Sequence, residues 1–116
     1  MAPPRIDSYR FGEIVIDGQR YTRDVIVCPD GVRAEWWREE GHSLSVADLD
    51  EVLGEPPEVL VIGQGANGRM DVPGDTRRYL EEAGMQVIVE QTDRACEVYN
   101  QLCQEKSVVA ALHLTC

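Results

Sequence analysis

The sequence has few of the residues on which metal sites and disulfide frameworks depend. It contains two histidines and four cysteines, and no two cysteines are spaced Cys-x-x-Cys. This spacing provides no zinc ligand set, so we expect neither a metal nor a cofactor. Cys96 and Cys103 lie on one expected helix, about 10 Å apart along its axis, which is beyond disulfide reach. We therefore expect free thiols and a cytoplasmic protein.

Long apolar runs and basic clusters are also missing. No segment approaches the roughly 20 apolar residues of a membrane-spanning helix, and the first residues, MAPPR, open no apolar signal region. The chain has 21 acidic and 11 basic residues and a net charge of −10, so a phosphate backbone would be repelled. These absences predict a soluble protein without a membrane span that does not bind nucleic acid.

The most informative segment is a continuous apolar run that ends in glycines. Residues 58–68 read EVLVIGQGANG. Valine, leucine and isoleucine without polar alternation are typical of a strand buried on both faces, as in a parallel sheet covered by helices. We therefore expect the central strand of a sheet over residues 59–63.

Helical and strand patterns alternate after this strand. Apolar spacing predicts a helix over residues 76–83 and another over 92–104. Two further strands are expected over residues 85–90 and 108–112. Thr92 is placed to cap the second helix. Because the connections run through helices, the three strands are expected to be parallel.

The N-terminal half instead predicts antiparallel strands. Residues 11–16 and 19–28 are joined by Asp17-Gly18, a dipeptide that favours a type I′ turn. A third strand is expected over residues 32–38, with Trp36 and Trp37 on opposite faces, one in the core and the other over a cleft.

These patterns predict an α/β fold with three layers. Its central mixed sheet has a parallel βαβαβ half and is joined by an N-terminal β-meander. Residues 1–9 are expected to form a short polar lead, and residues 10–116 a single domain.

Loops that follow parallel strands gather at one edge of the sheet, where open α/β sheets bind ligands. We expect any site at this edge, with the segment that contains Trp37 and His42 closing over it. The candidate binding residues are Trp37, Arg38, His42, Gly63, Gly65, Asn67, Gly68, Thr92 and His113. We assign no catalytic residue.

The turn Gly63-x-Gly65-x-x-Gly68 has the glycine spacing of the dinucleotide fingerprint. Residues 69–74 intervene before the next helix, however, so a pyrophosphate cannot sit directly on that helix N-terminus. A dinucleotide is therefore disfavoured against two other interpretations. The glycines permit a tight turn and close backbone approach, or the turn amides hold a small anion or metabolite with Arg69 or Arg77.

A cysteine–histidine nucleophile is disfavoured. His113 and Cys116 are offset by an odd number of residues, so they face opposite sides of a regular strand. No carboxylates stand out as an acid–base pair. The residues favour a binding protein over an enzyme.

An ordered set of short motifs resembles a known family. The motifs are Phe11-Gly12, Asp17-Gly18, Trp37-Arg38, Gly41-His42, Val61-Ile62-Gly63-x-Gly65, Tyr99-Asn100 and His113-x-Thr115-Cys116. The chain resembles the DUF498, or MTH938-like, family of small domains. Relatives include the adipogenesis-associated domain protein of animals and a mitochondrial assembly factor for respiratory complex I.

The resemblance implies a three-layer fold with a mixed central sheet and no established enzymatic activity. In the mitochondrial relatives it implies a partner-binding role in assembly. One lysine against ten arginines suggests a bacterial source. The sequence thus predicts a non-enzymatic partner-binding or assembly module. The alternative is a protein that binds a small molecule or anion at residues 63–68. The oligomeric state stays open.

Overall fold

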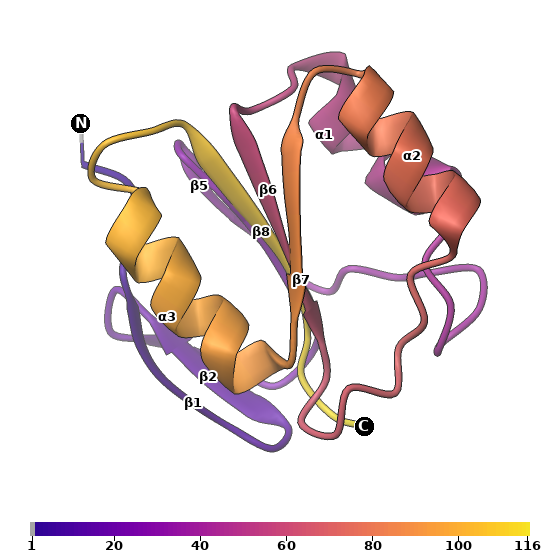
Figure 1. Ribbon diagram of the computed structural model, residues 1–116. Helices are drawn as coiled ribbons and strands as arrows, with labels where there is room; N and C mark the ends of the chain where they lie inside the picture. The colour runs from indigo at the N-terminus through magenta and orange to yellow at the C-terminus, as the bar shows by residue number, and fades with distance from the viewer. Residues whose placement is uncertain (1) are drawn as a thin grey trace.

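The structure, a computed structural model, describes residues 2–116 and contains two β-sheets (Figure 1). The smaller sheet is antiparallel, with β1 at Ile6–Arg10, β2 at Glu13–Ile16 and β3 at Gln19–Tyr21. The predicted Asp17-Gly18 pair joins β2 to β3. Its φ angles of 49° and 79° are both positive, as a type I′ turn requires.

The larger sheet has five strands in the order β5-β4-β8-β6-β7. Their bounds are β4 Val25–Cys28, β5 Gly31–Arg33, β6 Val59–Gln64, β7 Gln86–Glu90 and β8 Val108–His113. Strand β6 is parallel to β7 and β8, whereas β4 is antiparallel to β8 and β5. The predicted α/β fold with a mixed sheet is confirmed. The middle strand, however, is β8 and not β6.

Helices cover both faces of the five-stranded sheet (Figure 1). They are the 3₁₀ helix η1 (Val46–Leu49), α1 (Asp50–Gly54), α2 (Gly74–Glu82) and α3 (Thr92–Leu102). One core contains Val61 and lies under α3 and the small sheet, and the other contains Ile62 and lies under η1, α1 and α2. Successive residues of β6 therefore enter different cores, which explains its unbroken apolar run.

Strand β1 corrects the N-terminal boundary that the sequence predicts. Residues 6–9 belong to this strand and not to a polar lead. The Asn100 side chain accepts a hydrogen bond from Ile6 N–H (3.0 Å) and donates one to the Ile6 carbonyl (2.8 Å). Tyr99 O–H donates to the Pro4 carbonyl (2.7 Å). The Tyr99-Asn100 motif thus holds β1 from α3, and Asn100 lies 94 residues after Ile6 in the chain.

Two predicted strands are also wrong in extent. The segment expected as one strand over residues 19–28 is divided at residues 22–24, so that β3 and β4 belong to different sheets. The strand expected over residues 32–38 ends at Arg33. Glu35 adopts a φ of 55°, which no β-strand tolerates, and the chain turns there.

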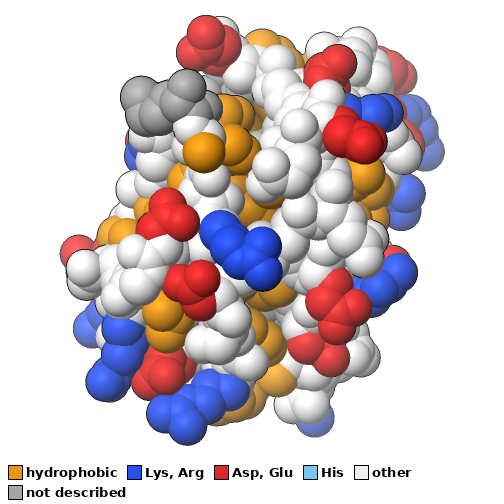
Figure 2. Space-filling view, turned by 90° about the vertical axis from the view of Figure 1, so that its left-hand side faces the viewer, with side chains coloured by type: hydrophobic (Ala, Val, Ile, Leu, Met, Phe, Trp, Pro, Cys, Tyr) orange, Lys and Arg blue, Asp and Glu red, His pale blue; other side chains and the backbone are white. Residues whose placement is uncertain are grey.

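The surface carries charges of both signs. Figure 2 shows acidic and basic side chains interspersed on the face that lies at the left of Figure 1. That face has no continuous basic stripe of the kind that nucleic acid would favour. Among residues 2–116, no helix has the length and apolar character required to cross a membrane.

Candidate functional site

Residues 34–42, which we call the tryptophan loop, follow β5 at the edge of the large sheet. Glu35 adopts a left-handed conformation that costs a non-glycine residue roughly 1 kcal/mol or more. Beyond this turn, Trp36 N–H donates to the Asp24 carbonyl (2.8 Å) and Trp36 Nε1 donates to the Asp48 carbonyl (2.9 Å). Trp36 is half-buried, whereas Trp37 is 71% exposed. The loop therefore displays one tryptophan in water while the other anchors it.

A buried ion network fixes this loop to the end of β8. Arg38 Nη1 and His113 Nδ1 each lie 2.8 Å from Asp24 Oδ2. The Leu114 N–H donates to Asp24 Oδ1, also at 2.8 Å. The side chains of Arg38 and His113 are 5% and 7% exposed, and that of Asp24 is 16% exposed. The charges are therefore paired largely out of water, where an unpaired charge would be costly.

Asp24 is the acceptor at the centre of the network. Burial by itself raises the pKa of this carboxyl. The hydrogen bonds from His113 and Leu114 N–H, together with the Arg38 guanidinium beside it, outweigh that effect, and the pKa lies below its ordinary value. Because an ionised carboxylate only accepts, the Asp24 contact places a proton on His113 Nδ1. The 3.0 Å approach of Arg38 Nη2 to Nδ1 is then a contact and not a hydrogen bond. Among residues 2–116, the buried Nε2 of His113 has no hydrogen-bond partner.

Arg38 also closes the tryptophan loop on itself. Its Nε and Nη2 donate to the Gly41 carbonyl (3.2 and 2.9 Å), and its guanidinium carbon lies 4.8 Å from the centre of the Trp36 ring. The His42 ring packs edge-on against His113 with 5.8 Å between the ring centres. Three candidate residues from the sequence, Arg38, His42 and His113, therefore lie together.

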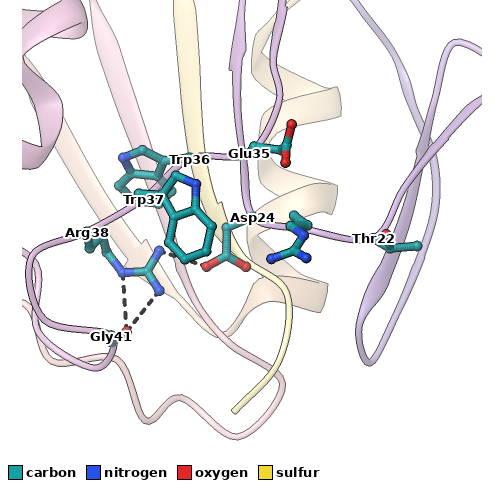
Figure 3. Close-up of a pocket in the computed structure, with 8 residues that line it drawn as sticks. Thr22, Asp24, Glu35, Trp36, Trp37, Arg38 and Gly41 are labelled. Atoms are coloured by element: carbon teal, nitrogen blue, oxygen red, sulfur yellow. Dashed lines mark hydrogen bonds and ion pairs between the residues drawn. The ribbon is translucent and has the colours of Figure 1, made fainter.

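The tryptophan loop borders two hollows. The Arg23 cleft has a volume of about 480 Å³ and is lined by Thr22, Arg23, Asp24, Glu35, Trp36, Trp37, Arg38 and Gly41. Figure 3 shows Trp37 beside Asp24 and Arg38 in this cleft. The Arg23 guanidinium carbon lies 5.7 Å from the centre of the Trp37 ring. The Asp50 groove, about 530 Å³, is lined by Ile26, residues 33–39, Ala47, Asp48, Asp50 and Glu51.

The glycine turn after β6 is filled by the protein's own backbone. A Cβ atom on Gly65, whose φ is +100°, would lie 2.3 Å from the carbonyl carbon of Cys116. The N–H groups of Ala66 and Arg69 donate to the carbonyls of Thr115 (2.6 Å) and Cys116 (3.0 Å). Amides that an anion would require are thus engaged internally. This geometry favours the interpretation that the glycines permit close backbone approach.

Thr92 lies beneath this turn and does not cap α3, whose N-cap residue is Gln91. Its hydroxyl donates to the His113 carbonyl (2.6 Å) and accepts from Gly65 N–H (2.8 Å). A Cβ on Gly63 would lie 2.8 Å from this hydroxyl. Gly63, Gly65, Thr92 and His113 therefore meet at the expected sheet edge, joined by packing. The remaining candidates in the turn lie further out: Asn67 is exposed, and Gly68 is beside the Gln91 side chain.

Asp24 is the site residue that no local sequence pattern singles out. It lies within residues 19–28, which read as one strand, and its three partners, Arg38, His113 and Leu114, are distant in sequence. The available signal is an acidic residue directly before the apolar run of β4. Such a position marks the point at which the chain leaves one sheet for the other.

No metal cluster is formed by the histidine, cysteine, aspartate and glutamate residues of the described part of the chain. The four cysteines are free. Burial raises the pKa of the Cys96 thiol to about 12, with a smaller contribution from Asp93, so this thiol stays protonated and unreactive.

Comparison with known proteins agrees with the resemblance inferred from the sequence. The family model described as "Protein of unknown function (DUF498/DUF598)" matches residues 6–113. A conserved hypothetical protein of Pyrococcus horikoshii OT3 is similar in structure with a TM-score of 0.82 and 26% identity, over 97% of this chain and 99% of that chain. A Bordetella parapertussis protein has 28% identity and a TM-score of 0.78, over 98% of each chain. A Mth938-like domain of Bordetella pertussis has 25% identity and a TM-score of 0.76, over 96% of this chain and 85% of that chain. The chain belongs to the DUF498 family, whose function is unknown.

Proposed function

We propose that the protein is a non-enzymatic, partner-binding module of the assembly type, and that the tryptophan loop is its contact surface. The observation that carries the proposal is Trp37, which is 71% exposed on a loop held by a buried ion network. Tryptophan and arginine are enriched at interface hot spots, and Arg23 lies over the Trp37 ring. When a partner covers an aromatic side chain that is exposed to water, the burial of its apolar surface favours binding.

The size of this gain fits a hot spot. An indole with 71% exposure leaves roughly 150 Å² to be covered. At about 25 cal/mol per Å², burying it contributes about 4 kcal/mol before the costs of association.

The loop is also preorganised for binding. Trp36 is anchored through its N–H and its ring nitrogen, and Arg38 is paired with Asp24. A loop that is already ordered loses little conformational entropy when a partner binds. The mitochondrial relatives named by the family resemblance act in complex I assembly, a partner-binding role. That role supports this class of function here, without indicating a particular partner.

Site-specific photo-crosslinking tests the proposal. A photoreactive phenylalanine analogue is placed at Trp37, or at the 54% exposed Tyr79 of α2 as a matched control, in the full chain expressed in its native host. We expect a discrete protein adduct from position 37 and none from position 79. A Trp37→Ala variant should lose the same partner in affinity capture.

Two results would contradict the proposal. One is the absence of any adduct at position 37. The other is stabilisation of the fold by a small anion or metabolite, seen as a raised melting temperature and lost in Trp37→Ala. At a hundredfold excess over Kd, such a ligand raises the free energy of unfolding by about 2.7 kcal/mol. The second result would assign the hollows at the tryptophan loop to a small ligand.

A further inference from the structure

We infer that the Asp50 groove receives a basic segment of the partner protein, one that carries arginine or lysine side chains. This inference rests on the proposed function, because the groove shares Trp37 with the contact surface described above. It adds the chemistry of the partner.

The Asp50 groove has an apolar floor. Ile26, Ala34, Trp36 and Ala47 contribute this lining, and Ile26 is 4% exposed and belongs to the core beneath. The methylene stem of a long side chain packs favourably on such a surface while its charged end stays near water. The floor alone would accept many apolar groups, so the charge of the walls decides the occupant.

The walls of the groove carry excess negative charge. Five carboxylates line it, from Glu35, Glu39, Asp48, Asp50 and Glu51, against the guanidinium groups of Arg33 and Arg38. Arg38 is paired with Asp24, and Arg33 is shared between Glu51 and Asp30. Within residues 2–116, no ion pair involves Glu35, Glu39, Asp48 or Asp50, although Asp48 accepts the backbone N–H groups of Glu39 and Ser45. Four carboxylates are therefore left without a counter-charge for a partner to supply.

The neighbouring Arg23 cleft does not have this excess. Its lining contains two carboxylates, from Asp24 and Glu35, and two guanidinium groups, from Arg23 and Arg38. The charges of that cleft balance. Charge complementarity therefore selects the Asp50 groove as the place for a cation.

One further property of the molecule favours a cationic partner. The net charge of −10 attracts a basic segment over longer distances and increases its association rate at low salt.

Peptide binding followed by tryptophan fluorescence tests this inference. The chain has two tryptophans, Trp36 and Trp37, and both line the groove, so the emission of the unmodified full chain reports on it. The probe is a peptide in which arginines alternate with leucine and glycine, and its control replaces each arginine by neutral citrulline. We expect the arginine peptide to shift the tryptophan emission at low salt, and the citrulline peptide to leave it unchanged.

Charge reversal separates a local contact from general attraction. Glu35→Lys with Glu39→Lys should weaken binding of the arginine peptide by about tenfold or more. Glu82→Lys with Glu105→Lys changes the net charge equally at exposed positions outside the groove, and should weaken binding by less than about threefold. Thermal unfolding of each variant shows that it is folded.

Three results would overturn the inference: equal loss of binding in both double variants, equal binding of the citrulline peptide, or no binding of the arginine peptide. The partner captured at position 37 provides a second readout, because its crosslinked segment must contain arginine or lysine. If crosslinking at position 37 persists in the double variant Glu35→Lys with Glu39→Lys, the protein binds a partner there, but the inference that the partner's segment is basic is wrong. If crosslinking fails everywhere, the proposed function itself fails.

Discussion

Replacement of Asp24 by asparagine should destabilise the protein by about 3 kcal/mol. The Asp24 carboxylate contacts Arg38, His113 and the Leu114 N–H, each at 2.8 Å. Asparagine retains one oxygen for Leu114 but leaves the Arg38 guanidinium, 5% exposed, without its counter-charge. Breaking one side of a buried ion pair typically costs 3–5 kcal/mol, and the 16% exposure of Asp24 favours the lower end. The melting temperature should fall by roughly 10–15 °C.

Urea unfolding followed by tryptophan fluorescence measures this loss. Asp75→Asn is the matched control, because the Asp75 side chain is 96% exposed in its pair with Arg78 and should change stability by less than about 0.5 kcal/mol. Adding Arg38→Met to Asp24→Asn removes the unpaired charge, so the double variant should lose less than the sum of the two single variants. The reasoning is refuted if Asp24→Asn costs no more than the control, or if the two losses are additive.

Three further perturbations test other parts of the structure. Because the pKa of Asp24 is lowered by folding, its stabilisation is complete above the unfolded value of about 4 and is lost as pH falls through the folded pKa; the unfolding free energies of wild type and Asp24→Asn should therefore converge in acid. Gly65→Ala should destabilise the fold by about 3 kcal/mol or more in urea unfolding, since its Cβ would meet a backbone carbonyl carbon at 2.3 Å and its φ is +100°, whereas Gly74→Ala, with nothing within 4 Å, should be close to neutral. Asn100→Ala removes both side-chain hydrogen bonds to Ile6, so it should cost about 1–3 kcal/mol and accelerate amide exchange in β1; unchanged exchange there would show that β1 is held by other contacts.

The sequence predicts the parallel half of the fold well because its signals are local. Val61 and Ile62 enter different cores, and this double burial appears directly as an unbroken apolar run. The rule that loops gather at the carboxyl edge of parallel strands brings His113 to the expected place. Arg38 and His42 join it there, although no periodicity in their loop indicates how the loop folds.

Other features depend on information that a local pattern does not contain. Asp24 acquires its role from Leu114, 90 residues away, so residues 19–28 read as one strand although the chain changes sheets there. Glu35 has a left-handed backbone without being one of the residues that usually adopt it, so residues 32–38 also read as one strand. Tertiary contacts at both positions override the local preference.

The position of β8 in the middle of the sheet has a consequence for synthesis on the ribosome. Strand β4 pairs with β8 through Val25 and Leu112, and β6 pairs with the same strand from its other side. At 5–20 residues per second, Leu112 follows Val25 by roughly 4 to 17 seconds. Through that interval, the edge of β4 that will pair with β8 is unpaired, and the edge of β6 is unpaired from the time residues 59–64 are made. Both edges are then open to strands of other nascent chains. Translation rate and chaperone access over the last third of the message should therefore influence the yield of folded protein more than changes earlier in it.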